Sequence, residues 1–332
     1  MNKQKIAYFL LTVLTLCAGF VDAQDVAYSQ FYANPLYLNP ALAGSKVCPR
    51  FTLNYRNQWP SINKGYVNYN ACYDQHFDKI SGAIGLMVNA SNAGGGILKS
   101  DAISLMYSYR LVISNSLVAN VGFQGTYLQN KLDWNSLVFE DQLISGIGVI
   151  NPVTLEAQPD HLTKGTSDFS AGMLIGYKES LYFGTAVHHL SQPDIAFYNN
   201  TPSKLDMKIT VHAGAYIDLE QGLDGNDIEN LSVSPNIMYI QQGNFRQLNL
   251  GMYMNVYPFV GGLWFRHNFE NPDAIIALLG FQHAQFKVGY SYDYTVSKLT
   301  NATGGAHEVS FAWQFPCPQK VFKIKAIKCP RF

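Results

Sequence analysis

The sequence predicts an all-β protein, a transmembrane antiparallel β-barrel of the outer-membrane type with about 14 strands. Apolar and polar residues alternate with a period of two through most of the chain, as in strands whose two faces meet different surroundings. Many alternating segments have ten or more residues, which is closer to a membrane-spanning strand than to a soluble strand of about five or six. Aromatic residues gather near the segment ends, as in the girdles of membrane barrels.

The first element is a predicted signal peptide over residues 1–23. Lys3 and Lys5 precede an apolar run over 6–20, and Ala23 supplies a small residue before the expected cleavage point. A transmembrane anchor needs about 20 apolar residues, so the shorter run favours the cleaved leader.

The next segment, 24–46, combines aromatic residues with two Asn-Pro steps, Asn34-Pro35 and Asn39-Pro40. A residue before proline is pushed toward extended geometry, so a long helix is excluded. Its aromatic side chains need burial. We expect the segment to fold into the barrel lumen or across its periplasmic mouth. The alternative is a partner-binding arm that becomes ordered only in a complex.

The barrel is predicted over 47–315. Its fourteen expected strands are 48–59, 66–77, 80–90, 99–112, 115–133, 168–178, 180–190, 207–218, 231–241, 244–257, 259–268, 273–283, 285–294 and 306–315. From a periplasmic N-terminus the even-numbered hairpins are short, except for 219–230, and the opposite set holds the long insertions 134–167 and 191–206. This asymmetry is typical of exported barrels. A soluble β-sandwich or propeller would also alternate, but with its apolar face inside.

The composition supports a chain that does not face water on all sides. Charged residues make up 14% of the sequence, against about 25% in ordinary globular proteins. The formal net charge is zero, which gives no support to nucleic-acid binding.

The polar faces of the strands carry charged residues that would lie at membrane depth. Such residues are costly unless they face an interior and find partners there. We expect a polar salt-bridge network in the lumen, with a conducting pore as the alternative. Its members are Arg56, Arg110, Arg266, Asp293 and Glu308.

The last strand ends in alternating aromatic residues, Phe311, Trp313 and Phe315, which look like an outer-membrane insertion signal. A basic tail follows over 316–332, with four lysines and two cysteines. We expect a periplasmic docking tail, with Cys317–Cys329 as a possible disulfide. Together with Cys48 and Cys72, four cysteines remain after the leader, and they allow three disulfide connectivities. The string CPRF occurs at 48–51 and at 329–332, which hints that the two ends lie close together.

The sequence contains no recognisable catalytic, cofactor or metal motif. It has no HExxH, CxxC, GxSxG or phosphate-binding loop. His188 and His189 are neighbours in a predicted strand, so they point to opposite faces and cannot chelate one metal together. DGND at 224–227 lacks the later carboxylate of a calcium loop, and we interpret it as a turn. We therefore expect a protein that is not an enzyme and has no cofactor.

Three stretches resemble one known family. They are YSQFYANPLYLNPALAGS at 28–45, RFTLNYRNQWPSI at 50–62 and VGYSYDYTVSKLTNATGGAHEVSFAWQF at 288–315. Together they look like the PorP/SprF family of the Bacteroidetes type IX secretion and gliding machinery. The matching signature residues are Gln30, Asn34, Pro35, Asn39, Pro40, Ala41, Gly44 and Ser45. The resemblance is strongest at both ends and weak across 135–206.

The resemblance implies a non-enzymatic outer-membrane component in contact with outer-membrane lipids. It would act as an anchor or adaptor for a periplasmic ring lipoprotein and its partner, or for the export or attachment of a surface adhesin. The resemblance does not select the branch. The alternative function is a diffusion channel or a transporter of hydrophobic solutes.

Overall fold

The computed structural model describes residues 25–46, 48–62, 65–144, 148–149, 153–178, 180–219, 231–269, 271–296 and 304–317. The predicted signal peptide, the DGND turn and nearly all of the basic tail lie outside these residues and stay predictions.

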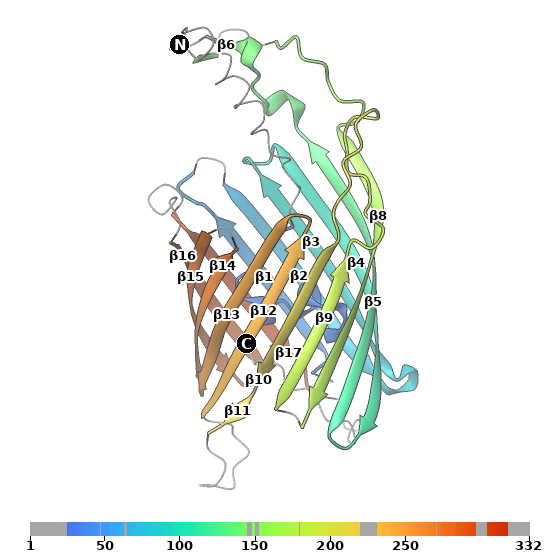
Figure 1. Ribbon diagram of the computed structural model, residues 1–332, viewed down its shortest axis with the longest axis vertical. Helices are drawn as coiled ribbons and strands as arrows, with labels where there is room; N and C mark the ends of the chain where they lie inside the picture. The colour runs from blue at the N-terminus through green and yellow to red at the C-terminus, as the bar shows by residue number, and fades with distance from the viewer. Residues whose placement is uncertain are drawn as a thin grey trace, which may run out of the picture.

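The described strands form one closed antiparallel barrel (Figure 1). Each strand pairs with its neighbours in turn, β1 pairs with β17, and β10 pairs with β12 to complete the ring. The strands are β1 (Arg50–Gln58), β2 (Tyr66–Phe77), β3 (Gly82–Ala93), β4 (Leu98–Ser114), β5 (Leu117–Leu132), β8 (Thr163–Tyr177), β9 (Leu181–His188), β10 (Lys208–Ala215), β11 (Ile217–Asp218), β12 (Leu231–Gln242), β13 (Phe245–Val256), β14 (Phe259–Asn268), β15 (Asn271–His283), β16 (Phe286–Thr295) and β17 (Ala306–Gln314).

The predicted count of fourteen strands is confirmed. The sheet has fifteen hydrogen-bonded strands, but the two-residue β11 continues β10 beyond Tyr216 and pairs with the same partner, β12. Most boundaries agree with the prediction to within three residues. The largest difference is β8, which begins at Thr163 instead of 168 because its pairing with β5 extends up to Lys131.

The two rims of the barrel differ in loop length. One rim, which we call the short-turn rim, holds both chain ends of the barrel. It also holds the tight turns at 78–81, 115–116, 257–258 and 284–285. The opposite, long-loop rim carries 133–162 and 189–207. The first of these loops contains η4 (Trp134–Ser136), η5 (Glu140–Gln142) and an unpredicted small hairpin of β6 (Leu143–Ile144) and β7 (Gly148–Val149), which stands above the barrel in Figure 1.

The outer face of the barrel is apolar. Leu105, Phe123, Leu263 and Leu279 point outward and are between 60% and 73% exposed. Outward apolar side chains on this scale fit a lipid environment, since a soluble sandwich or propeller would bury that face. The alternative of a soluble fold is therefore wrong.

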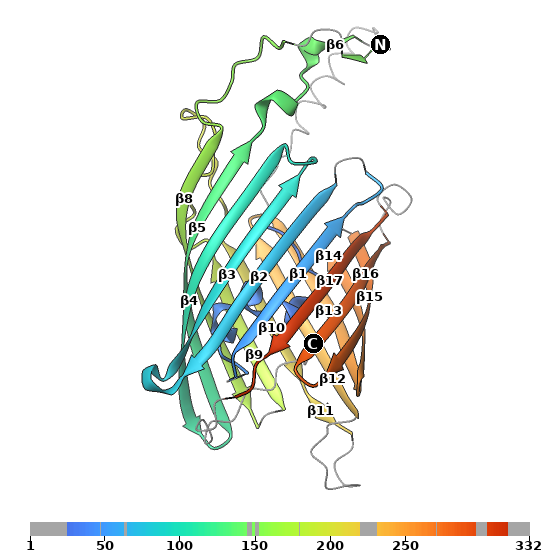
Figure 2. The same ribbon diagram turned by 180° about the vertical axis from the view of Figure 1, so that it is seen from behind.

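Residues 25–46 lie inside the ring of strands, as both views show in dark blue (Figures 1 and 2). We call this segment the plug. It contains three single turns: η1 (Phe31–Ala33), α2 (Pro35–Leu38) and η2 (Pro40–Leu42). The two Asn-Pro steps explain them, because Pro35 and Pro40 start a turn where a missing N–H costs nothing. The expectation of a segment packed in the lumen is confirmed.

The inner face is not polar throughout, which corrects one expectation. A sector of the lumen is apolar and packs on the plug, with inward-facing Met238, Tyr253, Val260, Trp264, Ile276 and Leu278 on β12 to β15. The ring of Phe31 meets the Trp264 ring edge-on at a centroid distance of 5.2 Å. These strands are apolar on both faces because lipid covers one face and plug aromatics cover the other.

The disulfide pairing also differs from the prediction. Cys317 is bonded to Cys48, with a Cα–Cα distance of 4.7 Å, and not to Cys329. The physical reason is the strand register. Arg50 pairs with Gln314 where β1 meets β17, so the residues that flank these two strand ends converge at the short-turn rim. The bond covalently joins the two strands that close the barrel.

This pairing predicts the disulfide map of the purified protein. Mass spectrometry after proteolysis without reductant is expected to find a Cys48–Cys317 peptide. The Cys329→Ser variant should retain that peptide and the Cys48→Ser variant should lose it. A Cys317–Cys329 peptide in the wild-type protein would contradict the pairing.

Candidate functional site

The centre of the site is a buried ion cluster that holds the plug to four strands of the wall, β1, β14, β16 and β17. Arg56 on β1 donates to Asp293 Oδ2 at 2.9 Å and to Glu308 Oε2 at 3.1 Å, and Arg266 on β14 donates to Asp293 Oδ2 at 3.0 Å. The cluster therefore contains two positive and two negative side chains, and its net charge is zero. We call these four residues the luminal quartet, and each is 5% exposed or less.

Ser29 of the plug lies inside the luminal quartet. Its Oγ accepts from Arg56 at 2.7 Å and from Arg266 at 2.6 Å, and it donates to Asp293 at 2.6 Å. Its backbone N–H donates to Glu308 at 2.7 Å. The hydroxyl and the backbone N–H of this serine thus bond only to charged partners, and such bonds are stronger than neutral ones.

The neighbouring signature residue, Gln30, extends this contact onto β17. Its N–H donates to Glu308 Oε1 at 3.1 Å, and its side-chain amide donates to the Glu308 carbonyl at 2.9 Å. Ser310 donates back to the Gln30 amide oxygen at 2.5 Å. The plug therefore binds β17 through both backbone and side-chain hydrogen bonds, as a bound peptide would.

Four of the five predicted luminal charges form the quartet, and Arg110 does not. Arg110 lies toward the short-turn rim, where it donates to Asn120 at 3.3 Å and to the carbonyls of Gly44 and Ser45. It still binds the plug, at the plug's other end. A second ion pair nearby was not predicted: Arg50 and Asp74 form two bonds of 2.9 and 3.0 Å, and the Gly44 N–H donates to Asp74 at 2.7 Å.

A notch of two glycines receives the middle of the plug. Gly122 on β5 and Gly172 on β8 are cross-strand partners. A Cβ at Gly122 would lie 2.4 Å from the Ala41 nitrogen, and one at Gly172 would lie 2.0 Å from the Asn39 side-chain oxygen. The absence of both side chains lets the Asn39-Pro40-Ala41 backbone touch the wall.

Asn39 fixes the plug in this notch. Its side-chain oxygen accepts from the Ala41 N–H at 2.9 Å and so caps η2. Its amide nitrogen donates to the carbonyls of Met173 and Thr185 at 3.1 Å each. The Ala41 carbonyl in turn accepts from Asn120 at 3.1 Å.

The eight signature residues therefore all lie in the plug, and all are buried. Gln30, Asn39 and Ala41 bind the wall, and Pro35 and Pro40 start turns. Asn34 accepts a weak bond from the Cys72 thiol, the Ser45 carbonyl accepts from Arg110, and Gly44 adopts a φ of +65° that favours glycine.

A second charge cluster holds the end of the plug nearest the long-loop rim. The Asp25 carboxylate contacts Lys208 and accepts from His189 at 2.9 Å, and its N–H donates to Gln242 at 2.9 Å. His189 also binds Asp168 at 2.7 Å. Sequence reasoning missed this cluster, because its members are up to 217 residues apart in the chain.

The electrostatics of this cluster favour its charged form. Burial alone would raise the pKa of Asp25, but the charges of Lys208 and His189 hold that pKa well below its usual range. Burial would lower the pKa of His189, but the Asp25 charge and the Asp168 hydrogen bond outweigh it and raise the pKa to about 9.

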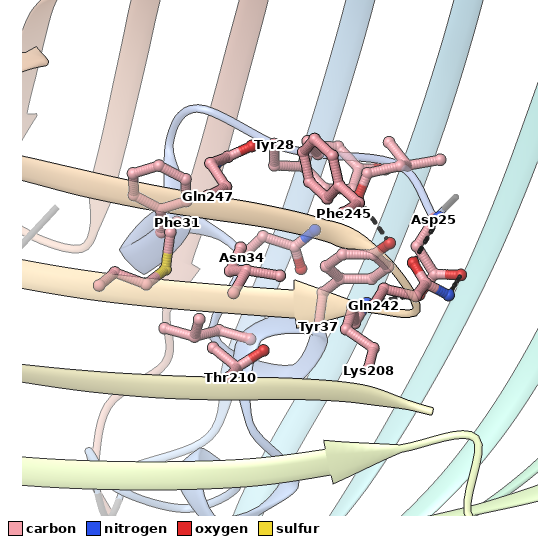
Figure 3. A pocket seen from close by; sticks show the side chains of 15 residues that line it. Asp25, Tyr28, Phe31, Asn34, Tyr37, Lys208, Thr210, Gln242, Phe245 and Gln247 are labelled. Carbon is pink, nitrogen blue, oxygen red and sulfur yellow. Dashed lines mark hydrogen bonds and ion pairs between the residues drawn. The ribbon is translucent and has the colours of Figure 1, made fainter. Parts of the chain in front are cut away.

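Beside this cluster lies a small cavity between the plug and the wall (Figure 3). It has a volume of about 50 Å³. Tyr28 and Phe31 of the plug line it together with Met238, Ile240 and Phe245 of β12 and β13. Asp25 and Gln242 lie at one end. The lining of this cavity is mainly apolar, whereas the neighbouring Asp25 cluster is charged.

The predicted insertion residues Phe311, Trp313 and Phe315 lie at the end of β17 that reaches the short-turn rim. The Trp313 ring stacks on Phe286 of β16 at 6.4 Å. Their role in insertion stays a prediction. Among the described residues, no group of three or more His, Cys, Asp or Glu is placed to hold a metal ion. No described helix is long and apolar enough to cross a membrane.

A closed barrel with an apolar outer belt and a packed lumen defines the class of the protein, an outer-membrane β-barrel with an internal plug. The family model of the type IX secretion system membrane proteins PorP/SprF matches residues 20–313. The chain belongs to the PorP/SprF family.

The chain is also similar to several solved structures, all of them distant in sequence. The outer membrane protein Omp33 of Acinetobacter baumannii is 7% identical with a TM-score of 0.43, over 81% of this chain and 99% of that one. The KdgM porin is 7% identical with a TM-score of 0.38, over 80% and 99%. The CymD monoaromatic hydrocarbon channel is 12% identical with a TM-score of 0.48, over 88% and 95%. Among curated proteins, no significant match is found.

The glycine notch predicts that Gly122→Ala loosens the plug, because the new Cβ would clash with the plug backbone. Overpacking of this kind costs about 1–3 kcal/mol. Cys72 is buried beneath the plug against Asn34, so its maleimide-labelling rate reports plug displacement. In a Cys329→Ser background we expect the rate to rise at least about fivefold.

The matched control is Gly125→Ala on the same strand. A Cβ there points outward, and its nearest neighbouring atom is 4.0 Å away. Its labelling rate should equal that of the parent. Equal rates for Gly122→Ala and Gly125→Ala would show that the notch does not hold the plug.

The Asp25 cluster predicts a pH dependence. His189 has a raised pKa in the folded protein, so its stabilising contribution is complete below about 6.5 and disappears as the pH rises through about 9. The melting temperature of wild type should exceed that of His189→Gln at pH 6, and the gap should shrink by pH 10. The outward-lying control His283→Gln should show no such trend. A gap that stays constant or widens with pH would contradict the cluster.

Proposed function

We propose that this protein is a non-enzymatic outer-membrane anchor or adaptor of the type IX secretion and gliding machinery. The observation that supports this function best is the plug. Its side chains or backbone contact the wall around the lumen, through β1 and β17 at Ser29, β8 at Asn39, β5 at Ala41, and β10 and β12 at Asp25. A barrel whose lumen is filled by a plug held in this way is suited to binding a partner protein and not to the passage of solutes.

The adaptor would present its short-turn rim to the periplasm. On this orientation, the Cys48–Cys317 bond lies on the side where periplasmic ring proteins assemble, and we expect the basic tail to dock there. The tail supplies positive charge for docking. The opposite, long-loop rim would face outward, where an exported adhesin attaches.

The second candidate is a channel or a transporter of hydrophobic solutes. One observation favours it, the apolar cavity between Tyr28, Phe31 and Met238 beside the plug. A carrier that uses this cavity must also move the plug, because the luminal quartet holds Ser29, which lies between the lining residues Tyr28 and Phe31 in the chain.

Single-channel recording separates the two candidates. The purified wild-type barrel in a planar bilayer is expected to show no steady ohmic conductance, because the plug crosses the lumen. A variant without residues 25–46 should conduct, provided that its heat-modifiable gel mobility shows a folded barrel. Steady conductance of the wild type at the level of the deletion variant would contradict the plugged adaptor.

Affinity isolation from the native outer membrane tests the partner. Ring lipoproteins in the isolate would support the anchor branch, and a large surface adhesin would support the export branch. Removal of 318–332, which keeps the Cys48–Cys317 bond, should weaken recovery of the ring proteins without unfolding the barrel. Unchanged recovery would exclude the tail as the docking element.

A further inference from the structure

The side of the plug that faces the long-loop rim forms the floor of a second, larger cavity, which we call the vestibule. Its volume is about 220 Å³. Val26 and Tyr37 of the plug contribute to the floor, and the inner faces of β3, β4, β5 and β8 form one wall. Since the plug closes it below, the vestibule is a dead-ended site and not a section of a channel.

The wall of the vestibule has an ordered pattern that follows from strand register. One row across the sheet is polar, with Ser91, Ser100 and Asn130 in register. In the next row Ala102 and Leu128 form an apolar strip on β4 and β5, and Asn89 on β3 ends it. The third row is polar again on β4 and β5, with Ser104 and Thr126, and carries Met87 on β3. Neighbouring strands lie about 4.8 Å apart and successive rows about 7 Å apart, so the strip has about the size of one small ring.

The polar row nearest the plug is internally hydrogen-bonded. Ser104 and Thr126 hydroxyls lie 2.8 Å apart, and the Gln124 amide nitrogen donates to them at 3.2 and 2.9 Å. The Gln124 side-chain oxygen is buried and closed off from the cavity. The Gln124 amide therefore serves to orient the Ser104 and Thr126 hydroxyls.

The charges at the vestibule are balanced internally. Asp25 and Asp168 face Lys208 and His189, and the four groups bind one another. A charged ligand would have to compete with these pairs. A neutral ligand that brings many hydroxyl groups would not.

We propose that the vestibule binds a neutral saccharide. A sugar ring has an apolar C–H face bordered by hydroxyl groups, and the wall offers an apolar strip between two rows of hydroxyl and amide side chains. Hydroxyl and amide groups both donate and accept, as sugar hydroxyls require. The Tyr66 side chain, which also lines the vestibule, supplies an aromatic surface. A peptide fits less well, because its apolar side chains would meet the polar rows.

Calorimetric titration of the full-length purified protein tests this site. The probes are maltotriose, mannotriose and triacetylchitotriose, with a neutral Gly-Ser-Thr peptide of similar mass as the comparison. We expect saturable binding of at least one saccharide. Gln124→Leu should weaken it about tenfold by removing the buried amide. The matched control is Gln129→Leu, on the same strand but on its opposite face and outside the vestibule, which should bind as wild type does.

A second variant covers the case in which Gln124→Leu does not fold. Ala102→Trp fills the apolar strip without touching the plug contacts described above, and it should abolish saccharide binding. The proposal is overturned if none of the three saccharides binds, or if binding survives both vestibule variants. It is also overturned if the peptide binds in their place with the same dependence on Ala102.

Discussion

The structure depends on one interaction, the enclosure of Ser29 by Arg56, Arg266, Asp293 and Glu308. Burying four charges in a lumen is expensive, and their attraction offsets that cost only where hydrogen bonds satisfy them well. Ser29 and Gln30 supply such bonds from the plug side. The plug and the barrel therefore need each other: without the plug the charges lose partners, and without the charges the polar end of the plug would be buried unpaired.

The rest of the lumen follows from this arrangement. The plug extends from the quartet toward both rims, to Asp25 near the long loops and to Ser45 near the short turns. On one side it packs apolar rings against Trp264 and Tyr253, and on the other it lays backbone against the notch at Gly122 and Gly172. The same 22 residues, 25–46, thus pack apolar rings on the wall, bring their backbone into contact with it and bind its charged side chains. All eight residues through which this segment resembles the family signature lie among them.

Much of the fold could be predicted from the sequence, because a strand's period of two appears directly in residues such as Ile103 to Leu111. The plug was also predictable, since its aromatic residues had to be buried. Its partners were not. Ser29 carries no charge, so its residue type does not indicate charged partners, and Asp25 meets Lys208 only through the closure of the barrel. One usable signal was missed: the runs 263–265 and 275–279 are apolar on both faces, which indicates cover on the inside as well as the outside.

Hydrogen exchange of the protein in native outer-membrane vesicles tests the central claim most directly. The backbone amides of Ser29, Gln30 and Gly44 donate to buried carboxylates of the wall. If the luminal ion pairs hold the plug, these amides should exchange as slowly as those of the barrel strands. Exchange within seconds, at the rate of an exposed loop, would contradict a plug that is fixed in the lumen.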